Sequence, residues 1–123
     1  MAVEIFKKFR FDAAHSLPKA PEGHKCRRVH GHTFEVSIHV TGEVNPDSGW
    51  IIDFAEIKKA FGPLLEQFDH FYINDIEGLE QPTCENLCKW IWDRIEADLP
   101  GLSKIVVQEN ETCGAVYCGP GPR

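Results

Sequence analysis

The sequence has no apolar run that approaches the roughly 20 residues of a membrane span, and its N-terminus lacks the charged-then-apolar pattern of a secretion signal. It also lacks a surplus of positive charge, because 13 Lys and Arg stand against 19 Asp and Glu, a formal net charge of −6. A nucleic-acid-binding surface needs that surplus to neutralise phosphates. We therefore expect a cytoplasmic protein that binds neither membranes nor nucleic acid.

Cysteine is too sparse and too irregularly spaced for a disulfide framework. The chain has five cysteines, an odd number, which fits a reducing compartment. Cys84 and Cys88 fall on a predicted helix, and Cys113 and Cys118 flank a predicted turn, but neither pair has the two-residue spacer of a redox or zinc-knuckle motif. We interpret these four as structural thiols.

The order of predicted elements indicates one domain, 1–123, with an α+β fold. Two strand-like segments, 3–15 and 30–41, precede two helices, and two short strands follow at 104–111 and 115–118. This strand-strand-helix-helix-strand-strand order predicts a four-stranded antiparallel sheet with two helices on one face. The other face would be open, and we expect subunit association to cover it. The tail, 118–123, is expected to be loose.

Capping residues and apolar spacing define the two helices. Asp53, with Glu56 three positions on, is expected to cap the first helix, and Thr83 the second. Pro63 lies inside the first pattern and should kink that helix or end it early. The apolar stripes are Ile57, Ala60, Phe61, Leu64, Leu65 and Phe68 in the first helix, and Cys84, Leu87, Cys88, Ile91, Ile95 and Leu99 in the second.

Three histidines fall on the apolar side of the first two strands. Residues 33–41 alternate strictly, and counting back by twos places His30 and His32 on the buried face. His15 shares the parity of the apolar residues in 3–15. Gly31, between the pair, allows another backbone to approach closely. The sequence therefore predicts three imidazoles that point toward one interior.

A cluster of buried imidazoles needs a partner for its nitrogen lone pairs. Each histidine could be hydrogen-bonded separately in a polar part of the core. The strand spacing favours the alternative, a zinc ion held by His15, His30 and His32. Three protein ligands leave a fourth position open, as in catalytic zinc sites.

Two other histidines have patterns that differ from those of the cluster, and a basic loop lies beside the cluster in the sequence. His39 has the opposite parity and is expected at the surface, and His24 lies in a loop of turn-forming residues and is expected to be solvated. Four cations beside the histidines could attract an anionic group of a small substrate, or could form an ordinary solvated loop: Lys19, Lys25, Arg27 and Arg28.

The segment Cys26-Arg27-Arg28-Val29-His30-Gly31-His32 resembles the 6-pyruvoyl-tetrahydropterin synthase family, and within it the 6-carboxy-5,6,7,8-tetrahydropterin synthases, which have a cysteine at this short spacing before His-Gly-His. The similarity covers almost the whole chain. Its other motifs are Phe-Asp-Ala-Ala-His-Ser-Leu-Pro, Pro-Glu-Gly-His-Lys-Cys, Asp-Ser-Gly-Trp-Ile-Ile-Asp-Phe, Phe-Asp-His, Asn-Asp and Pro-Thr-Cys-Glu-Asn-Leu.

The resemblance implies a tunnelling fold, in which subunits associate through their sheets into a barrel with active sites between neighbours; we expect a hexamer made of two trimers. It implies zinc on the three histidines, Cys26 as the catalytic cysteine, and Asp69 with His70 as an acid-base pair from an adjacent subunit. Glu109 is the expected pterin anchor, with Glu111 as a rival, because the family's Glu-Thr is replaced here by Glu109-Asn110. Thr83 and Cys84 resemble pterin-contacting positions.

The activity that this resemblance implies is a zinc-dependent carbon–carbon lyase reaction. It converts 7,8-dihydroneopterin triphosphate and water to 6-carboxy-5,6,7,8-tetrahydropterin, acetaldehyde and triphosphate, in the 7-deazaguanine pathway toward queuosine. The first alternative is elimination of triphosphate to a 6-pyruvoyl pterin, although the short spacer from Cys26 to His30 favours the lyase. The second alternative is a zinc-binding protein without catalysis.

Overall fold

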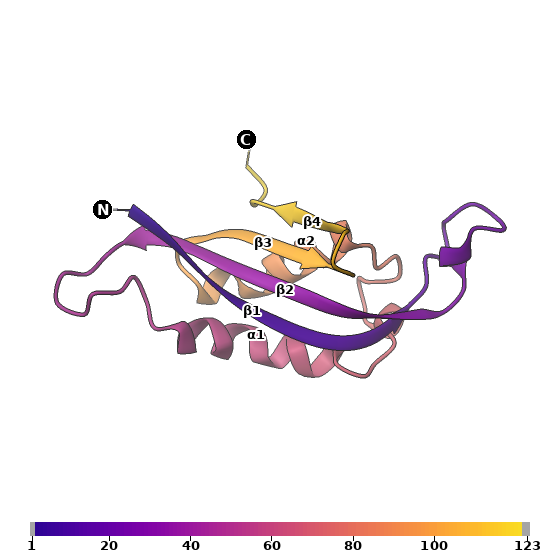
Figure 1. Cartoon of the computed structure of the whole chain (residues 1–123), viewed down its shortest axis with the longest axis horizontal. Coiled ribbons are helices and arrows are strands. Elements are labelled where there is room, and N and C mark those ends of the chain that lie inside the picture. The colour runs from indigo at the N-terminus through magenta and orange to yellow at the C-terminus, as the bar shows by residue number, and fades with distance from the viewer. Residues whose placement is uncertain (1, 122–123) are drawn as a thin grey trace.

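Two long antiparallel strands form one side of the sheet and carry the histidines near one end. The computed structural model describes residues 2–121. Its strands are β1 (Ala2–His15), β2 (His30–Glu43), β3 (Leu102–Gln108) and β4 (Gly114–Tyr117), and its helices are α1 (Phe54–Phe68) and α2 (Cys84–Ile95). The strands are neighbours in sequence order, β1-β2-β3-β4, and every pair is antiparallel (Figure 1). The predicted α+β fold and element order are confirmed.

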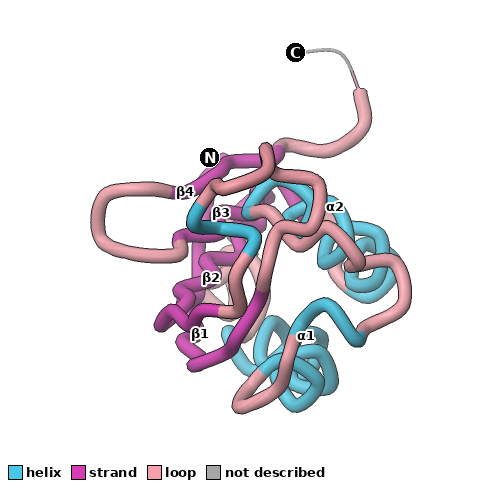
Figure 2. The backbone as a smooth tube through the Cα atoms, turned by 90° about the vertical axis from the view of Figure 1, so that its right-hand side faces the viewer, coloured by secondary structure: helices cyan, strands magenta, loops and turns pink. Residues whose placement is uncertain are grey.

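Both helices lie on the same side of the sheet (Figure 2). Helix α1 packs mainly against β1, and α2 packs against β3 and β4. The core between the layers is aromatic and aliphatic, with Phe34, Phe61 and Phe68 fully buried. Within residues 2–121 no helix covers the opposite face, where Phe6 and Val116 are 51% and 53% exposed.

Helix α1 begins as predicted but does not end where Pro63 suggested. The Asp53 side chain accepts a hydrogen bond from the Ala55 N–H (2.9 Å) and caps the helix. The helix then continues through Pro63 to Phe68, so the early end is wrong. A helix-interior proline costs about 3 kcal/mol. Burial of Phe61 and Phe68, on either side of the proline, offsets that cost, since a fully buried side chain of this size contributes roughly 1.5–3 kcal/mol.

Helix α2 starts at the predicted cap, because the Thr83 hydroxyl accepts a hydrogen bond from the Asn86 N–H (3.1 Å). The predicted stripe is buried, but Trp90 and Trp92 are buried as well, at 7% and 5% exposure. The helix ends at Ile95, and a short 3-10 turn, Glu96–Asp98, leads to Leu99. Helical spacing alone missed the two tryptophans, because Trp90 packs on the loop at Gly78 and Trp92 packs on Tyr117 of β4.

Strand β3 is shorter than predicted, and this moves both candidate glutamates off the strand. It ends at Gln108 rather than 111. The Asn110 side chain accepts hydrogen bonds from the N–H groups of Thr112 (2.8 Å) and Cys113 (2.9 Å), which closes a turn in place of strand pairing. Glu109 therefore lies at the strand end, and Glu111 is exposed in the turn instead of sharing a strand face with it. The predicted loose tail lies in part outside the described residues.

Candidate metal and catalytic site

His15, His30 and His32 meet at the paired ends of β1 and β2. The register places His15 opposite His30, with His32 two positions further along β2 on the same face. The three ring centroids are 4.6, 4.9 and 5.1 Å apart, and one nitrogen from each ring can be chosen so that all lie within 4.8 Å of one another. The predicted convergence of the three imidazoles is confirmed.

Backbone carbonyls orient two of the rings. His15 Nδ1 donates to the Pro82 carbonyl (2.9 Å), and His30 Nδ1 donates to the Arg28 carbonyl (2.8 Å). Each bond leaves Nε2 with its lone pair, the form that binds a metal. His15 Nε2 is buried and has no hydrogen-bond partner in the structure, and a buried polar atom left unpaired costs about 1–3 kcal/mol.

The donor set fits a metal ion of the zinc type. Nitrogens bound to tetrahedral zinc at about 2.05 Å are about 3.4 Å apart, a spacing that small side-chain adjustments give from the observed arrangement. A bound ion would also satisfy His15 Nε2. Burial lowers the pKa of His15 and of His32, and the neighbouring histidines act in the same direction. Both rings are therefore neutral near pH 7 and available as ligands.

Glu109 lies beside this cluster although it is no longer on the strand. Its Oε2 is 3.7 Å from His32 Nε2, beyond hydrogen-bond distance, so the carboxylate keeps its acceptors for another donor. Glu109 and His32 line a cavity of about 620 Å³ that also reaches Lys8 and Arg10. Glu111 lines the same cavity but is exposed in the turn. The geometry favours Glu109 over Glu111 as the residue that faces the histidines.

Cys26 lies in a 3-10 turn, Lys25–Arg27, immediately before β2. Its carbonyl accepts from the Leu17 N–H (2.7 Å), and its own N–H donates to His24 Nδ1 (3.0 Å). The first bond ties the cysteine loop to the residues that follow His15. The thiol is partly exposed, and the basic side chains of this loop surround it in sequence.

Asp69 and His70 lie beside β1, after the end of α1, and His70 lines a cavity of about 590 Å³ together with His32. Asp69 Oδ1 accepts from the Asp12 N–H (3.1 Å), and the His70 N–H donates to the Asp12 carbonyl (2.6 Å). His70 Nδ1 is 2.9 Å from Asp69 Oδ1, and the imidazole is 78% exposed. His70 adopts φ 66°, a left-handed conformation that is uncommon outside glycine. Such strain gathers at functional positions.

Thr83 and Cys84 both have a place in the fold that does not depend on a ligand. The Thr83 hydroxyl is occupied as the cap of α2. Cys84 is buried beside the backbone of Glu109, and burial raises the pKa of its thiol to about 12; burial likewise raises the pKa of the Cys88 thiol to about 12. Both stay protonated near neutral pH and are poor nucleophiles. The interpretation of Cys84 and Cys88 as structural thiols is consistent with their burial.

The two comparison histidines lie away from the cluster, as expected. His24 is exposed and caps the 3-10 turn. His39 lies on the open face but is only 13% exposed, so the expectation of a surface residue is wrong. It contacts Glu4 Oε1 through Nδ1 (2.8 Å) and Ser37 Oγ through Nε2 (2.9 Å), and its ring stacks on Phe6. Parity gave its face correctly but not the cross-strand neighbours that cover it.

The fold and the three-histidine site define a single-sheet α+β protein with a candidate metal centre. A family model described as 6-pyruvoyl tetrahydropterin synthase matches residues 4–120, so the chain belongs to this family and is an enzyme of the pterin synthase class. The resemblance carried by its motifs is confirmed at that level. No helix within residues 2–121 is long and apolar enough to span a membrane.

Individual relatives agree with this assignment. The chain is 41% identical over 122 residues to the 6-carboxy-5,6,7,8-tetrahydropterin synthase of Synechocystis sp., covering 94% of this chain and 93% of the relative. It is 36% identical over 105 residues to the dihydroneopterin monophosphate aldolase of Pyrococcus furiosus, covering 85% of each. The solved 6-pyruvoyl tetrahydropterin synthase of Caenorhabditis elegans superposes with a TM-score of 0.88 at 26% identity, covering 98% and 97% of the two chains.

Proposed function

We propose that this chain is a zinc-dependent 6-carboxy-5,6,7,8-tetrahydropterin synthase. It cleaves a carbon–carbon bond in 7,8-dihydroneopterin triphosphate and, with water, gives the 6-carboxy pterin, acetaldehyde and triphosphate. The observation that carries the proposal is the His15–His30–His32 cluster, with its unpaired buried nitrogen, next to the Cys26 loop. The name of the Synechocystis relative supports the choice of product.

The three histidines would hold the metal, and zinc bound there supplies a Lewis acid at the side-chain oxygens of the substrate. Glu109 accepts hydrogen bonds from the amino and ring N–H groups of the pterin and so fixes its orientation. Cys26 takes a proton from the substrate side chain as general base. The cavity of about 620 Å³ is of the size that encloses a small ligand.

Asp69 and His70 complete the acid-base chemistry from a neighbouring subunit. The 2.9 Å contact orients the imidazole, and His70 returns a proton to the departing fragment. This role requires a homo-oligomer, for which we propose a hexamer of two trimers. Thr83 contributes to the pterin pocket through its backbone, since its hydroxyl caps α2. We place the enzyme in the cytoplasm, in the 7-deazaguanine pathway toward queuosine.

Incubation of the zinc-loaded protein with 7,8-dihydroneopterin triphosphate, with products separated by mass, tests the proposal. A 6-carboxy pterin with acetaldehyde is expected. A 6-pyruvoyl pterin would instead identify the triphosphate-eliminating activity, and unchanged substrate would identify a non-catalytic zinc-binding protein. Because the Pyrococcus furiosus relative is named for the monophosphate, dihydroneopterin monophosphate is the matched second substrate, and its preferential cleavage would contradict the triphosphate assignment.

A further inference from the structure

The last residues of β1 are held by a short segment that follows α1. Ala14 forms a parallel bridge with Tyr72, and the Ala14 N–H donates to the Phe71 carbonyl (3.1 Å). The segment then turns into a 3-10 helix, Ile73–Asp75, so its backbone can no longer follow the strand. The sheet edge next to His15 thus needs another partner for its backbone groups.

The side-chain amide of Asn74 takes the place of that backbone. Its Oδ1 accepts from the Ser16 N–H (2.9 Å), and its Nδ2 donates to the Ser16 carbonyl (2.8 Å). The Ser16 hydroxyl is paired with the Tyr72 hydroxyl (2.7 Å). His15 therefore lies between Ala14 and Ser16, two residues whose backbone is fixed from the same edge.

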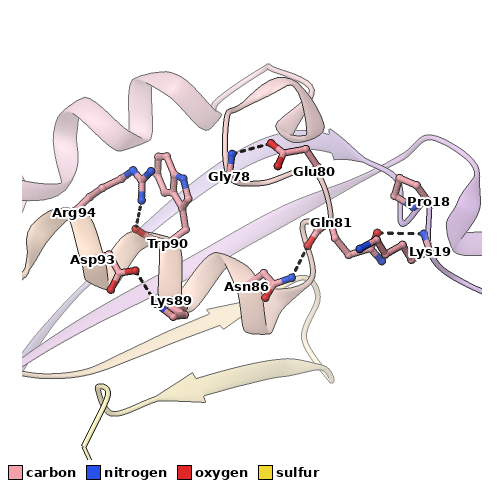
Figure 3. Close-up of a pocket in the computed structure, with 10 residues that line it drawn as sticks. All are labelled: Pro18, Lys19, Gly78, Glu80, Gln81, Asn86, Lys89, Trp90, Asp93 and Arg94. Carbon is pink, nitrogen blue, oxygen red and sulfur yellow. Dashed lines mark hydrogen bonds and ion pairs between the residues drawn. The ribbon is translucent and has the colours of Figure 1, made fainter.

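The same amide also reaches the segment that orients the His15 ring. Asn74 Nδ2 is 3.4 Å from the Glu80 carbonyl, a long hydrogen bond. Figure 3 shows how the next residue, Gln81, is held: its side chain accepts from the Lys19 N–H (3.1 Å), and its carbonyl accepts from Asn86 Nδ2 (2.8 Å). Pro82 follows directly, and its carbonyl is the acceptor for His15 Nδ1.

We propose that Asn74 is a positioning residue for the metal site. One amide ties the backbone that carries His15 to the segment that carries the Pro82 carbonyl, and so fixes the direction in which His15 Nε2 points. The inference rests on the proposed function only in requiring that the site binds a metal. Groups that orient a metal-bound histidine typically contribute 10–100-fold to metal affinity.

The cavity next to these hydrogen bonds does not explain why Asn74 makes them. It has a volume of about 490 Å³ and lies between α2 and the segments 18–19 and 78–81 (Figure 3). Two of its cations already have partners, since Lys89 pairs with Asp93 (2.8 Å) and Arg94 stacks on Trp90 (3.7 Å). Asn74 does not line this cavity, so its bonds serve the His15 side of the segment.

Substitution of Asn74 by Ala, with Asn45→Ala as control, tests the proposal. Asn45 likewise accepts from a backbone N–H, that of Asp47 (2.8 Å), but in the loop between β2 and α1. We expect Asn74→Ala to lower zinc affinity 10–100-fold in chelator competition and to alter the visible spectrum of the Co(II)-loaded protein at saturation. Asn45→Ala should change only thermal stability.

A milder variant keeps the test decisive if Asn74→Ala does not fold. Tyr72→Phe removes the hydroxyl that pairs with Ser16 and should weaken zinc binding several-fold in the same assay. Wild-type affinity in each variant that folds, with an unchanged Co(II) spectrum, would overturn the positioning role and leave the proposed function intact. A wild-type protein that binds no zinc would overturn both.

Discussion

At the scale of single residues, Cys26 offers the clearest separation of metal binding from catalysis. Cys26→Ala removes the proposed base but none of the histidines, so zinc content should stay at the wild-type level. Turnover should fall by about 10²–10⁴-fold, the usual contribution of a general base. Metal analysis and product formation measure the two effects. Cys113→Ala, an exposed thiol in the turn after β3, is the matched control and should remain active; full activity in Cys26→Ala would refute the assignment.

The backbone conformation of His70 is expected to lower the stability of the fold, although its imidazole is needed for turnover. Its φ of 66° is natural for glycine and strained for other residues, by roughly 1–2 kcal/mol. The free energy of unfolding of His70→Gly should therefore be about 1 kcal/mol larger than that of His70→Ala. Both variants should lose turnover. Urea denaturation gives the comparison. Equal stabilities would mean that the backbone at this position relaxes and stores no strain.

The three histidines illustrate what residue-level reasoning can and cannot predict. Alternation along β1 and β2 predicted their shared face, because one buried face fixes the register. The acceptors for His15 and His30 are carbonyls of Pro82 and Arg28, and no side-chain pattern reports a carbonyl. Glu109 was expected to anchor the pterin from a strand spanning 104–111, but the turn that Asn110 closes ends β3 at Gln108 and was not predicted.

At the scale of elements, the buried thiols of α2 should make stability fall in alkali. Burial raises the pKa of Cys84 and Cys88 to about 12 from 9.0. Because these pKa values are raised in the folded state, the two protonated thiols contribute fully to the free energy of unfolding below pH 9. This contribution is lost as pH rises toward 12, because only the unfolded chain releases its thiol protons between these pH values. Urea unfolding between pH 8 and 11 should show this decline.

Cys88→Ala isolates the effect from other groups that titrate in alkali. It removes one of the two thiols, so its free energy of unfolding should decline less steeply with pH than that of the wild type, whatever its value at pH 8. Parallel curves for the two proteins would show that the buried thiol does not titrate as described.

Element boundaries were predictable where a side chain caps or pairs with the backbone. Asp53 and Thr83 mark the starts of α1 and α2 in the sequence and in the structure. The early end expected as one of two outcomes at Pro63 was wrong, because burial from tertiary packing offsets the local penalty. The end of β3 was missed because Asn110 acts through its own neighbours, a local competition that strand alternation does not show.

At the scale of the whole molecule, the open sheet face predicts association. Phe6 and Val116 lie on that face and are about half exposed. We expect the protein to run as a multiple of its 13.9 kDa chain mass in light scattering. Phe6→Glu should shift it toward the monomer by placing a charge in an apolar contact, whereas Lys58→Glu on the exposed side of α1 should not. A monomeric wild type would contradict this expectation.

The proposed supply of Asp69 and His70 by a neighbouring subunit can be tested with two inactive variants. Cys26→Ala and His70→Ala should each be inactive alone. Mixed after dissociation and reassembly, they should regain part of the wild-type turnover, because some sites then combine an intact thiol with an intact imidazole from another chain. Absence of any recovery in mixed oligomers would place all these groups within one chain.

The carbonyls that orient His15 and His30 have a consequence for how this site can change over time. A carbonyl is present at every position, so the bonds that Arg28 and Pro82 make to the two rings depend on the main-chain path and not on the side chains at these positions. A substitution at residue 28 or 82 that keeps the main-chain path would preserve the orientation of the two imidazole rings. A single insertion or deletion nearby would change it. These two supports are thus encoded in loop length, whereas the support that Asn74 gives depends on its side chain.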